Sequence, residues 1–178
     1  MKRVALIVLV ILALLLFAVG ARREEDPITL PPEPKVDETS AATVRFDDTS
    51  VVVEVADTSA LRTQGLSGRA SLASGTGMLF VFEREDTYGF WMKDMRFPID
   101  IIWLRPVSGR VPEAAAGTNG IDAVPVEIVY VVHGATPESY PAIFEPLLPA
   151  QYVLEVPVGF VEGHRVKFGD RAEIHLPS

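Results

Sequence analysis

GMLFVFEREDTYGFWMKDMRFPIDIIWL, residues 77–104, contains two apolar runs of strand length separated by a polar turn. The runs, residues 78–82 and 99–104, are short and rich in β-branched and aromatic residues, as buried strands usually are. Between them, residues 90–95 read FWMKDM, so large apolar side chains stand directly beside a cation and an anion. This composition is typical of a pocket rim or of the edge of a core. The stretch therefore predicts two strands with a partly polar segment between them.

The rest of the chain from residue 43 onward follows the same β-rich pattern. A short helix is expected at residues 60–64, where Asp57, Thr58 and Ser59 supply capping side chains and Gly65 stops the helix. No helical period persists beyond about ten residues, and Gly- and Pro-containing turns separate the apolar runs. We expect a mainly β fold, either a sandwich, a jelly-roll-like arrangement or a partly open barrel, with one or two short helices. The strand-like runs lie at residues 44–46, 50–55, 78–82, 99–104, 127–132, 152–156 and 172–176, with the first two suggesting a hairpin, and residues 105–125 read as a surface loop or insertion.

The N-terminal segment reads as a secretory leader. Lys2 and Arg3 precede an unbroken apolar run over residues 4–19, and small residues follow. The run is long for a cleavable leader and short for a comfortable membrane span, so residues 1–20 are either a signal peptide or an N-terminal membrane anchor. Residues 21–42 are rich in proline and acid and predict a disordered tether. We thus expect residues 43–178 to form a single β-rich domain that is exported to the periplasm or another extracytoplasmic space, with membrane contact only through residues 4–20 if these are not cleaved.

Charge and composition exclude several classes of function. The 178 residues carry a formal net charge of −8, which opposes binding to a phosphate backbone and argues against a nucleic-acid partner. Cysteine is absent, so the chain has no disulfide, no thiol nucleophile and no thiolate metal ligand. The three histidines, His133, His164 and His175, lack the close spacing of a metal-binding pair. No serine nucleophile motif and no phosphate-binding loop occurs, so the sequence predicts no catalytic residue, metal or cofactor.

Several motifs in order resemble those of one known family. They read RTQGLSGR at residues 62–69, GMLFVF at 77–82, FWMKD at 90–94, PIDIIW at 98–103, YVLE at 152–155 and GD at 169–170. Over residues 43–176 the chain resembles the domain of unknown function 192 family of bacteria and archaea. The resemblance implies a compact, mainly β domain that is frequently exported, and it implies no substrate. The chain departs from the family pattern in its longer loop at 105–125, in Ser67 where methionine is usual, and in Met95-Arg96-Phe97 before Pro98.

Two acids on apolar strands are the first candidate site residues. Asp100 shares a strand face with Ile102 and Leu104, and Glu155 shares one with Val153. An acid among apolar neighbours must be paired or hydrogen-bonded, or its pKa rises. The two carboxyl groups fit a glycosidase pair if about 5–10 Å separates them. Alternatively, they form ion pairs with Arg62 and Arg69 and fix the short helix against the sheet.

Trp91 and Lys93 are the second candidate pair. An aromatic face stacks on sugars or cations, and a lysine binds carboxylates, so the two residues suit a ligand platform. The alternative is core packing, in which Phe90 and Met92 point inward while Trp91 and Lys93 cover an edge. A pocket, if present, is expected here first.

Our leading hypothesis is an exported, monomeric β domain that binds a small molecule or envelope component without transforming it. The tentative binding residues are Arg62, Arg69, Trp91, Lys93, Asp100 and Glu155. Two alternatives remain open. One is an envelope glycan hydrolase that uses Asp100 and Glu155, and the other is an interaction module for another envelope protein.

Overall fold

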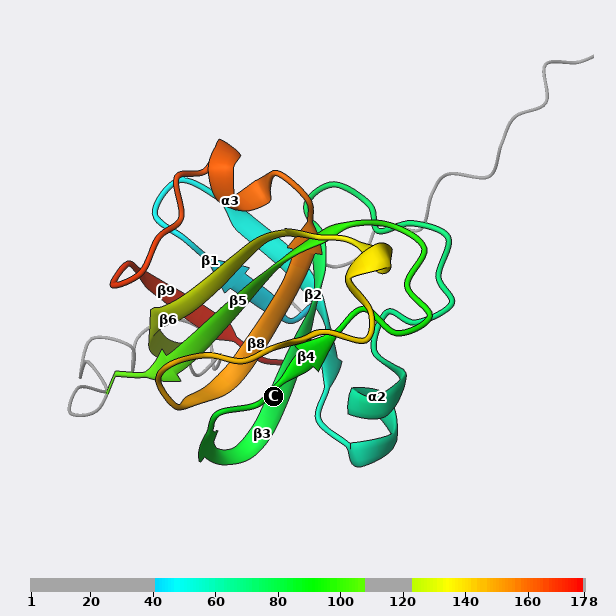
Figure 1. The fold of residues 1–178 in the computed structure, drawn as a ribbon. Helices are drawn as coiled ribbons and strands as arrows, with labels where there is room; N and C mark the ends of the chain where they lie inside the picture. The colour runs from blue at the N-terminus through cyan, green and yellow to red at the C-terminus, as the bar shows by residue number, and fades with distance from the viewer. Residues whose placement is uncertain (1–40, 108–122, 178) are drawn as a thin grey trace, which may run out of the picture. The chain divides into compact units, whose positions relative to one another are not determined.

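Seven strands form a closed barrel in the order β1-β2-β3-β8-β5-β6-β9 (Figure 1). The computed structural model describes residues 41–107 and 123–177, which lie in one compact unit. The prediction of a mainly β fold with short helices is confirmed, and among the expected arrangements the chain adopts a barrel whose sheet is closed. The strands are β1 (Thr43–Arg45), β2 (Ser50–Ala56), β3 (Thr76–Asp86), β5 (Ile99–Pro106), β6 (Ala123–Ala135), β8 (Ala150–Pro157) and β9 (Arg171–His175).

Strand pairing in the barrel is antiparallel except between β2 and β3. The predicted hairpin of β1 and β2 is confirmed, and β1 closes the barrel by pairing with β9. A parallel pair needs a crossover connection, which α2 (Ser59–Gln64) and the loop after it provide. Thr58 caps this helix by accepting a hydrogen bond from the Leu61 amide, at 3.2 Å, and Gly65 ends it with a φ of +49°. The sequence-based expectation for this helix and its two ends is therefore confirmed.

A small second sheet lies outside the barrel and was not predicted. It consists of β4 (Phe90–Trp91) and β7 (Ile143–Phe144), and the segment leading to β7 includes a 3₁₀ helix, η2 (Pro137–Ser139). In Figure 1 the yellow segment after β6 crosses in front of the barrel strands beside β4. The short helix α3 (Phe160–Gly163) lies at the upper end of the barrel in the same view. Two-residue strands are too short to leave a periodic signal in a sequence.

The central strands β5 and β8 bury both of their faces, because a separate core lies on each side of them. One core fills the barrel and includes Leu79, Ile102 and Leu154. The other lies between the outer face of the barrel and its covering segments, and it includes Phe80, Ile101, Trp103, Met92 and Met95. Alternation of side chains along β5 and β8 therefore sends successive residues to different cores. This explains why these strands read as continuous apolar runs with a single acid in each.

The structure refines the predicted domain boundaries. Ala42, placed by the sequence in the tether, is buried and accepts a hydrogen bond from the Val53 amide at 2.9 Å, so it belongs to the fold. The two ends of the predicted loop at 105–125 belong to β5 and β6. Its residues 108–122, the leader at 1–20 and residues 21–40 of the predicted tether lie outside the described residues. Within residues 41–107 and 123–177, no helix has the length and apolar character needed to cross a membrane.

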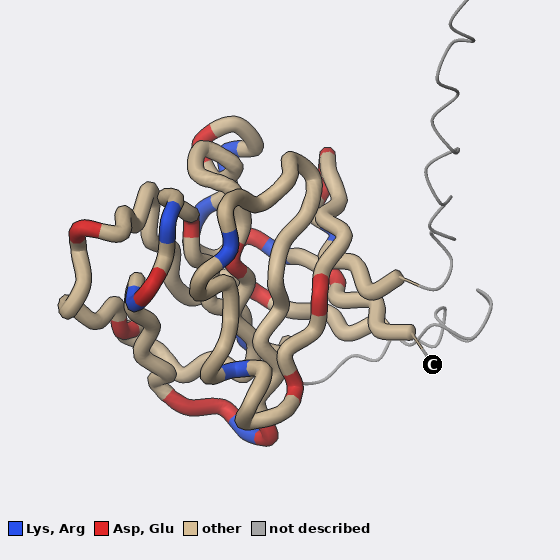
Figure 2. The backbone as a smooth tube through the Cα atoms, turned by 90° about the vertical axis from the view of Figure 1, so that its right-hand side faces the viewer, with Lys and Arg blue, Asp and Glu red and all other residues tan. Residues whose placement is uncertain are grey.

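Charged side chains of both signs are interspersed along the described backbone (Figure 2). Arg45 pairs with Glu173 across β1 and β9, and Arg105 pairs with Glu127 across β5 and β6. Such partly exposed pairs add little stability individually.

Candidate functional site

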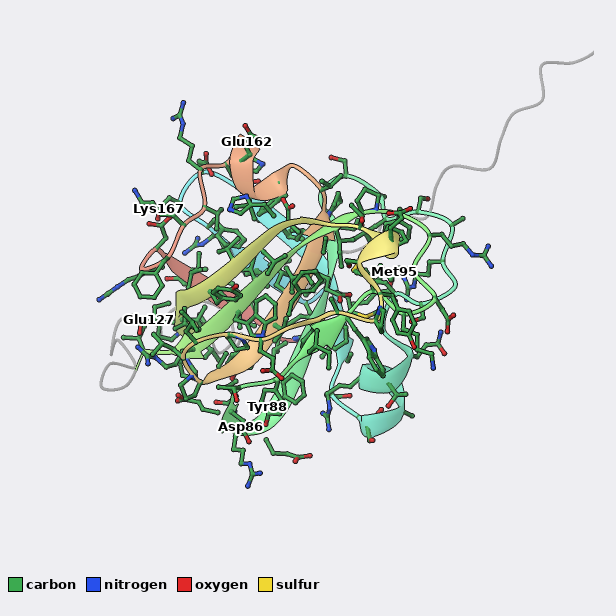
Figure 3. All side chains as sticks on the ribbon, viewed as in Figure 1. Asp86, Tyr88, Met95, Glu127, Glu162 and Lys167 are labelled. Atoms are coloured by element: carbon green, nitrogen blue, oxygen red, sulfur yellow. The ribbon has the colours of Figure 1, made fainter. Side chains whose placement is uncertain are left out.

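A cavity of about 300 Å³ opens on the outer face of the barrel, between α2, β3 and β4. This volume lies at the lower end of the range for small-molecule sites. In Figure 3 two of its lining residues, Tyr88 and Met95, lie on either side of β4. Five of the fifteen lining residues are aromatic, and the wall also contains polar groups from α2 and one acid. It consists of Ser59, Arg62, Thr63, Gln64, Gly65, Leu66, Ser67, Phe80, Phe82, Tyr88, Gly89, Phe90, Trp91, Met95 and Glu155.

The aromatic wall is built by strand alternation and edge-to-face packing. Phe80 and Phe82 project from the same face of β3, and Phe90 meets Phe80 edge to face with ring centroids 4.8 Å apart. Tyr88 stacks on Phe82, and its hydroxyl donates to the Arg84 carbonyl at 3.0 Å. These contacts hold the rings in place before any ligand arrives, which lowers the entropy cost of binding.

Glu155 is the buried acid of the cavity wall. It is only 5% exposed, and its register partners on the two neighbouring strands, Met78 on β3 and Ile101 on β5, are both apolar. Its Oε2 atom has no hydrogen-bond partner among the described residues. Burial raises the pKa of the Glu155 carboxyl to about 8, against the opposing influence of the positive charge on Arg69. The cavity therefore contains a carboxyl group whose hydrogen-bonding capacity the fold does not satisfy.

Arg62 fixes α2 against β3, although not with the predicted partners. Its Nη1 donates to the carbonyls of Asp57, at 2.6 Å, and Val81, at 2.8 Å, and its Nη2 lies 3.7 Å from Glu83. The guanidinium carbon lies 5.1 Å from the centroid of the Phe82 ring, a cation–π distance. Arg62 thus lines the cavity with a side chain that is already held by the protein.

Arg69 pairs with Glu54 on β2 rather than with either predicted acid. The pair is bidentate, with Nη1 donating to Oε1 and Nη2 donating to Oε2, the latter at 2.7 Å. This hydrogen bonding lowers the pKa of Glu54 and raises that of Arg69. Arg69 acts on Glu155 through its charge, without a hydrogen bond between them. The predicted ion pairs of Asp100 and Glu155 with the two arginines are therefore wrong.

Trp91 separates this cavity from a second one. The second cavity, of about 280 Å³, is lined by Thr63, Gln64, Ser67, Gly68, Trp91, Lys93 and Asp94, so the two share four lining residues. Trp91 is 51% exposed, and Lys93 Nζ lies 5.9 Å from its ring centroid. Phe90 and Met92 point into the outer core, as the packing alternative predicted, while Trp91 and Lys93 face outward. The packing alternative is therefore confirmed for Phe90 and Met92, while a ligand platform of Trp91 and Lys93 stays a prediction.

The rim of the two cavities is tied together by hydrogen bonds between distant segments. The Ser67 hydroxyl donates to the Lys93 carbonyl at 2.9 Å, and the Gly68 amide donates to the Asp94 carbonyl at 2.8 Å. Asp94 adopts a left-handed φ of +57°, which brings its carbonyl into position for this contact. The turn after α2 and the turn after β4 therefore form one connected wall.

Asp100 lies in the barrel interior and lines neither cavity. It is 1% exposed, and its two carboxylate oxygens accept hydrogen bonds from the amides of Gly134, at 2.8 Å, and Val161, at 3.0 Å. It thereby joins β5 to the end of β6 and to α3. Side-chain alternation directs Asp100 to the inside of the barrel and Glu155 to the outside, so the sheet stands between them. They are not placed to act together on one glycosidic bond.

Of the six predicted binding residues, the structure brings Arg62, Trp91 and Glu155 to one cavity. Lys93 lines the adjoining cavity. Arg69 lines neither cavity and pairs with Glu54, and Asp100 is a structural residue. The aromatic wall was not predicted. Its signal in the sequence was two pairs of aromatic residues, each pair spaced by two positions, on either side of the polar turn: Phe80 with Phe82, and Tyr88 with Phe90. Over the described part of the chain, no group of three or more His, Asp or Glu side chains is arranged to hold a metal ion.

Comparison with known proteins agrees with the resemblance seen in the motifs. The model of the DUF192 family, described as "Uncharacterized ACR", matches residues 42–174. No curated protein matches the chain. Among solved structures, a Sinorhizobium meliloti protein proposed to be a transcription regulator is 29% identical, with a TM-score of 0.59 over 76% of this chain and 95% of that one. A Novosphingobium aromaticivorans protein of unknown function is 24% identical, with a TM-score of 0.57 over 74% and 82% of the two chains, and shows likeness of fold alone.

Proposed function

The chain belongs to the DUF192 family, and we propose that this member binds a small organic molecule in the cavity between α2, β3 and β4 without transforming it. The observation that carries the proposal is a cavity with an aromatic wall that contains the buried carboxyl group of Glu155, whose Oε2 atom has no hydrogen-bond partner among the described residues. Concave sites lined by apolar and aromatic side chains, with a few polar groups among them, are the usual form of ligand pockets. A fold gains nothing by burying such a carboxyl unless something pairs with it.

Binding is favoured over glycan hydrolysis because the cavity offers one carboxyl group where that reaction needs two. The second acid of the predicted pair, Asp100, faces the barrel interior and is saturated by two backbone amides. The cavity keeps the aromatic rings and polar atoms that orient a ligand.

A small-molecule ligand is also favoured over DNA. The Sinorhizobium meliloti protein is described as a proposed transcription regulator, but the present chain carries a net charge of −8. Binding to a phosphate backbone depends on clustered Lys and Arg side chains that displace counterions. Among the described residues, Arg62, Arg69, Arg45 and Arg105 each have an acidic partner within 4 Å.

A thermal-shift screen of the full-length chain tests the proposal. The panel consists of sugars, organic acids, organic amines, nucleotides and divalent metals. A ligand at 100 times its dissociation constant adds about 2.7 kcal/mol of stability, which is readily detected. We expect at least one organic compound to stabilise the protein and to quench or enhance the fluorescence of Trp91.

Two matched variants locate the binding site. Trp91→Ala removes a half-exposed ring from the cavity wall, whereas Phe168→Ala removes an exposed ring that lines neither cavity. The proposal requires that Trp91→Ala weakens binding at least tenfold and that Phe168→Ala leaves it unchanged. Equal affinity in both variants would place any ligand elsewhere. A complete absence of hits would instead favour the interaction module, for which Trp91, Tyr140 and Ile143 provide neighbouring exposed apolar side chains.

We further propose that the domain acts outside the cytoplasm as a monomer. The support is the leader pattern of residues 1–20, with Lys2 and Arg3 ahead of an apolar run. Fractionation of cells, followed by determination of the N-terminal residue of the mature protein, tests export and cleavage together. Recovery of the uncut chain in the cytoplasm would overturn the proposal, whereas recovery in the membrane fraction would identify the segment as an anchor. Light scattering of the purified protein measures the oligomeric state.

A further inference from the structure

The chemistry of the cavity narrows the class of ligand, and this inference rests on the proposed function. Around Glu155, the neighbouring strands present only the apolar side chains of Met78 and Ile101 at the paired positions. The nearby arginines are already engaged, Arg62 by two carbonyls and Glu83, and Arg69 by Glu54. Glu155 lines the cavity, and among the described residues its buried Oε2 atom has no hydrogen-bond donor. A ligand that enters the cavity therefore gains the most binding free energy by donating a hydrogen bond to Glu155.

The walls favour a donor that carries positive charge. The faces of aromatic rings attract cations, and two rings of the wall already interact with cations of the protein itself. Arg62 lies over Phe82 and Lys93 lies near Trp91, at 5.1 and 5.9 Å from the ring centroids. An anionic ligand group would instead meet a carboxyl group and the negative faces of the rings. The cavity thus favours a cationic ligand group over an anionic one.

We propose that the ligand is an organic amine, with its ammonium group hydrogen-bonded to Glu155 and an apolar body packed against Phe80, Phe82 and Trp91. The ammonium group supplies up to three donors, and Oε2 of Glu155 has none among the residues that the structure describes. A charge-assisted hydrogen bond in a buried site is stronger than a neutral one. The limited volume of about 300 Å³ selects a small amine rather than a polymer.

Binding of the amine is coupled to release of a proton. Because burial raises the pKa of Glu155 to about 8, the carboxyl group is mostly protonated at pH 7 in the empty protein, and a bound cation favours its ionised form. The charged or titratable groups around Glu155 are Arg62 and Tyr88, which line the same cavity, and Arg69, which acts on Glu155 through its charge. From pH 6 to 7 the affinity for the amine should therefore rise about tenfold, and from pH 7 to 8 about fivefold, with release of about one proton per ligand at pH 7.

The test compares three probes that share one apolar body: phenethylammonium, 2-phenylethanol and 3-phenylpropanoate. Each is titrated calorimetrically into the full-length chain at pH 7, in phosphate and in a second amine-free buffer of different ionisation enthalpy. We expect the ammonium compound to bind at least tenfold more tightly than the other two and to release about one proton. In Glu155→Gln, which keeps the size of the side chain but cannot ionise, we expect this preference and the proton release to disappear. If the variant does not fold, proton release by the unmodified protein still tests whether Glu155 ionises when the amine binds.

The possible results separate this inference from the proposed function. Equal binding of the three probes, or tightest binding of 3-phenylpropanoate, would refute the amine and leave a small-molecule site. An ammonium preference that persists in Glu155→Gln would refute the role of Glu155. Failure of all three probes to bind would refute the amine, and only a negative result of the wider screen would refute the proposed function as well.

Discussion

Replacing Glu155 with glutamine should make the protein more stable at neutral and alkaline pH. The carboxyl group has a pKa of about 8 in the folded protein, raised by burial, against 4.5 for the ordinary group. Between these two values the unfolded chain is ionised while the folded chain still holds the proton. The folded state therefore binds more protons, and its free energy of unfolding falls as pH rises. This contribution is fully present below pH 4.5 and is lost as pH rises through 8.

The magnitude follows from the same values. The rise from 4.5 to about 8, at about 1.4 kcal/mol for each pH unit, corresponds to about 5 kcal/mol across the whole range. This figure is an upper value, because water entering the cavity on ionisation reduces the cost. Glutamine resembles the neutral carboxyl group and removes this pH dependence. The stabilities of the two proteins should thus be similar near pH 4 and diverge progressively up to pH 8.

Guanidinium unfolding of the empty protein at intervals from pH 4 to pH 9 measures the effect. The buffers must contain no amine, since an amine that binds to Glu155 would stabilise the unmodified protein. Glu85→Gln is the matched control, because it makes the same change of charge at an exposed position. Stability curves of the unmodified protein and Glu155→Gln that stay parallel from pH 5 to pH 9 would refute the reasoning. If the curves of Glu155→Gln and Glu85→Gln both diverge from that of the unmodified protein in the same way, the effect is one of net charge and the reasoning is also refuted.

Three further changes test other parts of the structure. Asp100→Asn replaces a carboxylate that accepts two backbone amides by a group with one acceptor oxygen, so it should cost about 2 kcal/mol in chemical unfolding; a loss below 0.5 kcal/mol would contradict the structural role. Gly77→Ala places a Cβ atom 2.7 Å from the carbonyl oxygen of Glu155 and should cost about 1–3 kcal/mol, whereas Gly163→Ala, with open space around it, is the control expected to have little effect. Arg69→Met removes the charge that lowers the pKa of Glu155, so this pKa should rise above its present value; NMR titration of the carboxyl carbon measures it, and an unchanged or lowered pKa would show that the charge does not act there.

Much of the fold was predictable because its signals are local. Thr58 and Gly65 mark the two ends of α2, and the continuous apolar runs of β5 and β8 mark buried strands. The closure of the sheet and the parallel pairing of β2 with β3 depend on contacts between distant segments. No pattern within a single strand specifies which neighbour it will pair with. The covering sheet of β4 and β7 was missed for the same reason, since each strand has two residues.

The candidate site, like the fold, has features that the sequence predicts and features that depend on contacts between distant segments. The sequence by itself determined that Asp100 and Glu155 sit on apolar strands, each with a carboxyl group that must find a partner or change its pKa. Only the tertiary structure decided their different outcomes. Asp100 points into the barrel, where the amides of Gly134 and Val161 satisfy it, and Glu155 points outward to a cavity where Oε2 has no donor among the described residues. The physical reason is that hydrogen-bond partners and desolvation come from segments far apart in the chain, which only folding brings together.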